Sequence, residues 1–153
     1  MKIAVVSDTH NNTATLEKAL GWIEKQNIQL ILHCGDISSQ EFIDYAKKYF
    51  DGEIKYVKGN ADHDIRNIPD SDTLEVGGKK IGIVHYPNEA KRMAKSGKYD
   101  IVFYGHTHRP WDEKVGECHM VNPGELAGQF YKPTFAVYDT DSGTLELKIL
   151  EKL

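Results

Sequence analysis

Seven polar residues of the 153-residue chain have the side chains of a metal site, and each follows a short apolar run. They offer imidazole nitrogens and carboxylate or amide oxygens, without a thiolate, a mixture that suits first-row divalent ions. Two such ions, about 3.5–4 Å apart, would polarise a phosphoryl group and generate hydroxide at neutral pH. The candidate metal ligands are Asp8, His10, Asp36, Asn60, His85, His106 and His108.

The spacing within this set predicts that its members meet. In Asp8-Thr9-His10 and His106-Thr107-His108, an extended backbone would place both side chains of each pair on one side. A glycine precedes each of Asp36, Asn60 and His106, and glycine permits tight turns and close backbone approach.

The apolar runs before these residues predict the strands that position them. Strands are expected at 3–6, 30–32, 54–57, 81–84 and 101–104. With helices between the first three, the order β-α-β-α-β predicts a parallel sheet. Ligands of such sheets bind at the carboxyl ends of the strands, which is where the seven residues fall.

Helix signals follow the first two strands. Asn12 or Thr13 can cap a helix that carries an apolar stripe of Leu16, Ala19, Leu20 and Ile23. Ser38 and Glu41 have capping-box spacing. The helix they open is expected to have Phe42, Ala46, Tyr49 and Phe50 along one side.

The second half of the chain predicts shorter elements. Gly77-Gly78 suits a hairpin turn between strands at 73–76 and 80–84, and a weak helix is expected at 89–95. Short strands are expected near 120, 135–138 and 145–150, with a turn at 141–143 between the last two. No linker or repeat interrupts the chain, so one α/β domain spanning 1–153 is predicted.

Composition excludes several classes of function. The formal net charge is −4, which argues against a module that grips long nucleic acid. Two cysteines, Cys34 and Cys118, give no disulfide framework and no zinc motif. No signal peptide and no apolar stretch of roughly 18 residues is evident, so we expect a soluble, cytoplasmic protein without a membrane partner.

The ordered blocks D-x-H, GD, GN, H and GH-x-H resemble the calcineurin-like metallophosphoesterases, in particular the small bacterial and archaeal phosphodiesterases. They stand at Asp8-Thr9-His10, Gly35-Asp36, Gly59-Asn60, His85 and Gly105-His106-Thr107-His108, and Asn122-Pro123-Gly124 adds a motif of the small subgroup. The resemblance implies a four-layer α-β-β-α sandwich of two mixed sheets flanked by helices.

The resemblance also implies roles for the seven residues. Asp8, His10 and His108 would bind one ion, Asn60, His85 and His106 a second, and Asp36 would bridge them. Asp36, Asn60 and His85 are the expected catalytic residues, and a bridging hydroxide would attack the phosphorus of a small phosphodiester. Mn²⁺ is the favoured cofactor, with Ni²⁺, Co²⁺, Fe²⁺, Zn²⁺ and Mg²⁺ as alternatives.

Two questions of function stay open at this point. The alternative to an enzyme is a non-catalytic protein-interaction scaffold, because a eukaryotic retromer subunit has a similar small fold. The oligomeric state is also open, with a homodimer among the alternatives.

The sequence departs from the family pattern at three positions. Ala61 stands where larger phosphatases have a histidine that protonates the leaving group, so cleavage of poor leaving groups should suffer. His63 could substitute, although a solvated loop position is expected. Tyr86 replaces a usual glycine and either contacts substrate or packs on the hairpin, and Asn11 replaces a glycine that needs φ > 0.

Other candidate residues have simpler expected roles. His33 and Cys34 are expected to pack in the core, and Cys118 and His119 receive no chemical role. Arg109 could meet a phosphate oxygen or form a surface salt bridge. The aromatic residues Trp111, Phe130 and Tyr131 could form an exposed patch, but core burial is expected for each.

Overall fold

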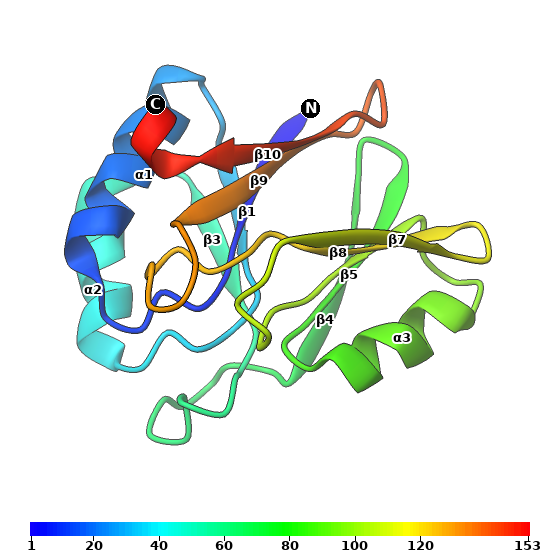
Figure 1. Ribbon diagram of the computed structural model, residues 1–153, viewed down its shortest axis with the longest axis horizontal. Coiled ribbons are helices and arrows are strands. Elements are labelled where there is room, and N and C mark those ends of the chain that lie inside the picture. Colours follow the sequence, from blue (N-terminus) through cyan, green and yellow to red (C-terminus); the bar gives the residue numbers. More distant parts are fainter.

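The computed structural model describes all 153 residues, which form two five-stranded mixed sheets with three α-helices outside them (Figure 1). One sheet has the order β10-β9-β1-β2-β3 and the other the order β4-β5-β6-β8-β7. The elements are β1 (Lys2–Val6), α1 (Thr13–Lys25), β2 (Leu30–His33), α2 (Gln40–Tyr49), β3 (Glu53–Tyr56), β4 (Ser71–Val76), β5 (Lys79–Val84), α3 (Pro87–Lys95), β6 (Ile101–Phe103), β7 (Trp111–Val115), β8 (Cys118–Asn122), β9 (Thr134–Asp139), β10 (Leu145–Ile149) and a short 3₁₀ turn (Leu150–Lys152).

The first sheet has the parallel centre that the sequence predicted. Ala4 of β1 pairs with Ile31 of β2, which pairs with Ile54 of β3, and both pairings are parallel. Strand β9 adds to the other side of β1 in the antiparallel sense, and β10 pairs antiparallel with β9. The carboxyl ends of β1, β2 and β3 therefore meet at one edge of this sheet.

Helix α1 begins as predicted. The Asn12 side chain accepts the backbone N–H of Thr15, which satisfies one of the free donors at the helix start. The expected stripe of Leu16, Ala19, Leu20 and Ile23 is buried.

The predicted capping box of α2 is wrong. Helix α2 begins at Gln40, and its N-cap is Ser39, whose Oγ accepts the N–H of Phe42. Ser38 has a positive φ of 89° and donates its N–H to the Asp62 carboxylate, so it belongs to the preceding loop. Phe42 and Ala46 are buried as expected, and so is Phe50 just past the helix, whereas Tyr49 is exposed.

The second sheet begins with the expected hairpin. Gly77 and Gly78 join β4 to β5 with φ values of 56° and 77°, the left-handed conformation that a tight hairpin turn requires. Strands β5, β6 and β8 are parallel, and β7 pairs antiparallel with β8 at the edge. Strand β7 was not predicted, because its sequence WDEKV is largely polar and exposed, as suits an edge strand.

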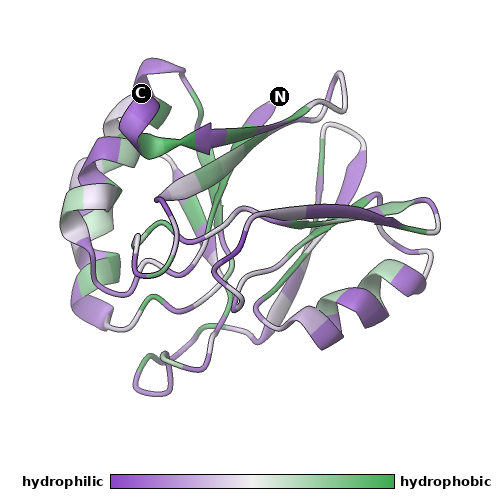
Figure 2. Ribbon diagram, in the orientation of Figure 1, coloured by the Kyte–Doolittle hydropathy of each residue, from purple (hydrophilic) through white to green (hydrophobic).

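Alternating residues of β1 show how the layers pack. Ala4 and Val6 belong to the core under α1 and α2, whereas Ile3 and Val5 face the core between the two sheets. A third core under α3 covers the outer face of the second sheet. Figure 2 shows hydrophobic residues along the inner strands and hydrophilic ones along much of α3 and β7. The expected four-layer α-β-β-α sandwich is confirmed.

None of the helices combines the length and the apolar character that crossing a bilayer would require.

Candidate metal centre

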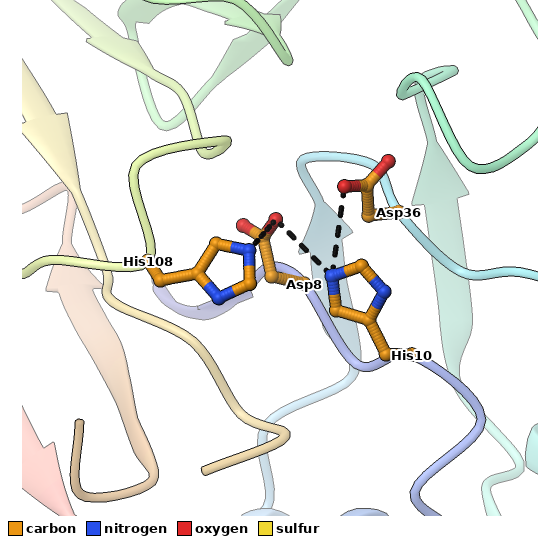
Figure 3. Close-up of side chains that lie close together, drawn as sticks. All are labelled: Asp8, His10, Asp36 and His108. Atoms are coloured by element: carbon orange, nitrogen blue, oxygen red, sulfur yellow. Dashed lines mark ion pairs between the residues drawn. The ribbon is translucent and has the colours of Figure 1, made fainter. Parts of the chain in front are cut away.

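The loops after five strands bring the predicted residues together. Ligand atoms of Asp8, His10, Asp36 and His108 lie within 4.8 Å of one another, and Figure 3 shows these side chains pointing toward a common space. The other three form an adjacent group: the Asn60 Oδ1 atom is 3.1 Å from both His85 Nε2 and His106 Nδ1. All seven predicted residues therefore converge.

Asp36 joins the two groups. Its Oδ2 atom lies 3.5 Å from His10 Nε2 in the first group and 3.4 Å from His85 Nε2 in the second. The other oxygen, Oδ1, accepts the backbone N–H of Ala61 at 2.9 Å, which fixes the carboxylate in this position. One carboxylate oxygen thus faces both halves of the site.

The paired residues meet by a different backbone geometry from the predicted one. Asp8, His10, His106 and His108 have positive φ values of 52°, 42°, 74° and 65°, so neither D-x-H nor H-x-H is an extended segment. Left-handed backbone is costly for residues other than glycine and concentrates at functional sites. The loops turn sharply here and aim both members of each pair at one centre. Asn11 also has a positive φ, of 60°, as expected for a residue in place of glycine.

The buried carboxylate of Asp8 has one oxygen bonded and one without a partner. Its Oδ2 atom accepts the Ser7 hydroxyl at 2.6 Å and the His106 N–H at 3.1 Å. The Oδ1 atom and the Nε2 atom of His10 are buried without a hydrogen-bond partner. A buried polar group without a partner costs about 1–3 kcal/mol. A divalent cation would satisfy both atoms, and the nitrogen and oxygen donor set suits one.

Hydrogen bonds fix the orientation of two histidines. His85 Nδ1 lies 2.7 Å from the Cys34 carbonyl oxygen, and His108 Nδ1 lies 3.1 Å from a Glu125 carboxylate oxygen. Because those oxygens only accept, each Nδ1 carries a proton, and each Nε2 is the nitrogen that would offer its lone pair to a bound cation. Metal-binding histidines are typically held in this way.

The charges of the site perturb the pKa values of three groups. Burial would raise the pKa of Asp36, but hydrogen bonds from His85 and the Ala61 N–H outweigh it and lower the pKa to about 2. The neighbouring Asp8 carboxylate, whose Oδ1 atom is 3.8 Å from His10 Nε2, raises the pKa of His10. Burial would lower the pKa of His85, yet the neighbouring Asp36 carboxylate raises it. Clustered carboxylates thus favour positive charge in this space.

Two of the glycines are required by close packing. A Cβ atom on Gly35, whose φ is 100°, would lie 2.6 Å from His85 Nδ1. A Cβ atom on Gly105 would lie 2.6 Å from Asp8 Oδ2. The predicted close approach of backbone to ligand side chains is confirmed at both positions.

Residues 1–143 match the family model described as the calcineurin-like phosphoesterase superfamily domain. The chain belongs to this superfamily. The predicted family is confirmed, and the predicted class of activity, metal-dependent phosphoester hydrolysis, follows from that membership.

Archaeal proteins of the superfamily are similar over nearly the whole chain. A phosphodiesterase of Methanocaldococcus jannaschii is 31% identical over 99% of this chain and 100% of its own. A probable metallophosphoesterase of the same organism is 34% identical over 81% of this chain and 67% of its own.

Solved structures share the fold. An archaeal phosphodiesterase superposes with a TM-score of 0.88 at 29% identity, covering 97% of this chain and 99% of the other. A Vps29 variant from Entamoeba histolytica has a TM-score of 0.78 and covers 97% of each chain. Its identity of 21% makes that a likeness of fold alone.

His63, the possible substitute for the missing histidine at Ala61, and Tyr86 have different surroundings. His63 is 77% exposed, and its Nε2 pairs with Asp64 at 3.5 Å, so it is a solvated loop residue as expected. Tyr86 lies against the site, with its ring centre 5.0 Å from that of His85 and 5.3 Å from that of His106. Tyr86 therefore lies beside the predicted site, and its contact with substrate stays a prediction.

His33 is a packing residue, as predicted. Its Nδ1 atom accepts the Gly35 N–H at 3.1 Å, so its Nε2–H donates to the Thr9 hydroxyl at 3.0 Å. Both ring nitrogens are engaged. Burial lowers the pKa of His33 to about 4, so the ring is neutral in the folded protein near pH 7.

Core burial was the wrong expectation for three aromatic residues. Trp111, Phe130 and Tyr131 are 46%, 77% and 47% exposed. Trp111 lies on the edge strand β7 beneath the Arg109 guanidinium, which is 4.9 Å from its ring centre, and a contact of Arg109 with phosphate stays a prediction. Phe130 and Tyr131 lie on a loop whose backbone N–H groups donate to the buried Glu125 carboxylate, while their side chains stay exposed.

Sequence reasoning missed two buried carboxylates that support the site. Asp62 and Glu125 are both fully buried and accept several backbone N–H groups. The signal for Asp62 was present, since it is an acidic residue two positions after the Gly59-Asn60 block. Glu125 follows the Asn122-Pro123-Gly124 motif and had no comparable signal.

Proposed function

We propose that this chain is a phosphodiesterase that uses two divalent cations. The observation that carries the proposal is the position of Asp36, whose Oδ2 atom faces His10 on one side and His85 on the other at 3.5 and 3.4 Å. A carboxylate oxygen shared between two sets of ligands is what a two-ion site requires.

The ligands divide into two sets around Asp36. One ion would be held by Asp8, His10 and His108, the other by Asn60, His85 and His106, with Asp36 common to both. Divalent ions here would supply Lewis-acid polarisation of a phosphoryl oxygen and would lower the pKa of water. Mn²⁺ is the favoured ion, and the nitrogen and oxygen donors also accept Ni²⁺, Co²⁺, Fe²⁺, Zn²⁺ or Mg²⁺.

The protein's own residues orient the substrate. Asn60 and His106 are exposed, whereas Asp8 and His85 are buried, so the site opens to solvent on the Asn60 side. The Asn60 Oδ1 atom faces the two histidines, which leaves its amide N–H₂ free to donate to an equatorial phosphoryl oxygen. The Asp36 carboxylate, which accepts the Ala61 N–H, is thereby fixed between the two sets of ligands.

The missing general acid favours diesters with good leaving groups. A methyl group at Ala61 cannot donate a proton, and His63 projects into solvent beside Asp64. An archaeal relative of nearly the same length is a phosphodiesterase, and a solved archaeal phosphodiesterase has the same fold. A small diester is therefore the proposed substrate, with no role for long nucleic acid. A cytoplasmic location and a homodimer stay predictions.

Hydrolysis of bis(p-nitrophenyl) phosphate and p-nitrophenyl phosphate tests the proposal. With Mn²⁺, Ni²⁺, Co²⁺ or Mg²⁺ we expect turnover of the diester to exceed that of the monoester, and Asp36→Ala to abolish both. The matched control is Asp44→Ala, which removes a carboxylate from the surface of α2. No turnover of either ester with any of these ions would defeat the proposal.

The non-catalytic scaffold is a weaker alternative. Its support is the likeness of fold to Vps29 at 21% identity. A scaffold has no requirement for seven converging ligands or for the left-handed backbone that places them. We therefore favour the catalytic function over the scaffold.

A further inference from the structure

Glu125 is a fully buried carboxylate that accepts four N–H groups. Three come from the backbone of the loop 129–131: Gln129 donates to Oε1, while Phe130 and Tyr131 donate to Oε2 at 2.9 and 3.2 Å. The fourth is His108 Nδ1, 3.1 Å from Oε2. A carboxylate that satisfies this many donors holds each of them in place.

The bond to His108 decides which ring nitrogen faces the metal centre. A carboxylate has no proton to give, so the Nδ1 atom of His108 must be the donor, and its Nε2 atom keeps the lone pair. That Nε2 lies 3.3 Å from Asp8 Oδ1, the buried oxygen without a hydrogen-bond partner. Glu125 thus presents the correct nitrogen to the centre.

The bonds to the loop place an aromatic side chain beside the same histidine. The Phe130 ring is 77% exposed, with its centre 5.3 Å from that of His108. An exposed ring held on an anchored loop offers apolar surface that a bound organic group can cover. Here the ring stands beside His108, a proposed metal ligand, so an organic group of a phosphate ester bound at the metal centre would lie next to it.

We propose that Glu125 is a positioning residue that couples the metal site to substrate recognition. It fixes His108 for metal binding, and it holds Phe130 as a wall that packs against a ring-bearing organic group of the phosphate ester. This inference rests on the proposed function, because it assumes that the phosphate lies at the seven ligands.

Calorimetric titration with Mn²⁺ tests the first half without measuring activity. Glu125→Gln has one acceptor oxygen for four donors, so we expect its metal affinity to fall about 10- to 100-fold. Glu117→Gln, an exposed residue in the β7–β8 turn, is the matched control and should keep the wild-type affinity. A folded Glu125→Gln protein with wild-type affinity would overturn the proposal.

A second measurement covers the case in which Glu125→Gln does not fold. Nitrogen chemical shifts of the wild-type protein loaded with Zn²⁺ report the tautomer of His108. The proposal requires the proton on Nδ1. A proton on Nε2 would contradict it.

Binding of phenylphosphonate and methylphosphonate to the metal-loaded protein tests the second half. Wild type should prefer the phenyl compound, and Phe130→Ala should lose about 2- to 10-fold of that preference, as expected for an aromatic contact. Tyr131→Ala is the control from the same loop and should keep the preference. An unchanged preference in Phe130→Ala would contradict the role of Phe130 in recognising the organic group. Failure of the proposed function itself would appear separately, as no turnover of either nitrophenyl ester by wild type.

Discussion

The buried carboxylate of Asp62 accepts the backbone N–H of Asp36 at 2.8 Å, across 26 positions of sequence. The same carboxylate accepts the N–H groups of Ile37, Ser38 and Gly59, each at 2.8 Å. It therefore ties the loop after β2 to the loop after β3. Together with the bond from the Ala61 N–H to Asp36, this side chain keeps Asp36 and Asn60, which those loops carry, in their relative positions.

Replacing Asp62 by alanine should destabilise the protein and weaken the site together. Four backbone N–H groups, three of them in buried bonds, would lose their acceptor, and we expect the free energy of unfolding to fall by about 3–5 kcal/mol. Urea denaturation measures the loss. Asp64→Ala is the matched control, because Asp64 is 88% exposed, and it should change stability by less than about 0.5 kcal/mol. Equal effects of the two substitutions would contradict this role.

Gly59→Ala should disrupt the metal site while leaving the core intact. The added methyl group would overlap the Asp36 carboxylate, so Asp36 must move away from His10 and His85. We expect stability to fall by about 1–3 kcal/mol, and metal-dependent turnover to fall at least about 100-fold, since small misplacements are costly.

A second glycine provides the control for that substitution. Gly21 lies within α1 with nothing within 4 Å of its added Cβ. Gly21→Ala should stabilise the protein by about 0.5–1 kcal/mol and leave turnover unchanged. A Gly59→Ala protein that behaves like Gly21→Ala would show that the contact with Asp36 is unimportant.

Stability should fall on mild acidification because of His33. Burial lowers its folded pKa to about 4, whereas the unfolded chain binds the proton near pH 6.5. The stability that depends on neutral His33 is therefore fully present above about pH 6.5 and is lost as pH falls toward 4, by about 3 kcal/mol in all. Unfolding measured from pH 7 to 4 in EDTA should show a shallower decline for His33→Gln. His63→Gln, at an exposed position, should follow wild type, and parallel curves for all three proteins would refute this explanation.

The sequence predicted the parts of the fold that rest on apolar periodicity. Ile3–Val6 and the stripe from Leu16 to Ile23 specify buried elements whatever lies around them, and both are observed. Strand β7 could not be predicted, because its pairing with β8, not its own composition, makes it a strand. Ser39 replaced Ser38 as the cap of α2 because Asp62, far away in sequence, captures the Ser38 N–H.

The sequence predicted which side chains come together at the candidate site, but not the contacts that hold them there. Seven side chains with nitrogen or oxygen donor atoms, all near strand ends, were sufficient to predict that they cluster. The left-handed backbone of His106 and His108 and the anchoring role of Glu125 depend on tertiary contacts. The exposure of Phe130 follows from that anchor, so hydropathy alone placed it wrongly in the core.

Restoring a histidine at Ala61 should extend the reaction to poorer leaving groups. Ala61 donates its N–H to Asp36, so a side chain at this position starts beside the proposed phosphate site. General-acid help is typically worth 10²–10⁴-fold, and we expect Ala61→His to gain at least about 10-fold on methyl phenyl phosphate but little on bis(p-nitrophenyl) phosphate. Ala61→Asn is the control without an acid. Equal gains on both esters, or none, would show that Ala61 does not explain the missing acid.

Counting the cations bound per chain tests the central claim most directly. Calorimetry with Mn²⁺, on protein first stripped with EDTA, should give two equivalents for wild type. Asp36→Asn should lose high-affinity binding of at least one ion, because its Oδ2 position faces both ligand sets. A wild-type protein that binds one ion or none, or an Asp36→Asn protein that binds two as tightly as wild type, would contradict the two-ion site.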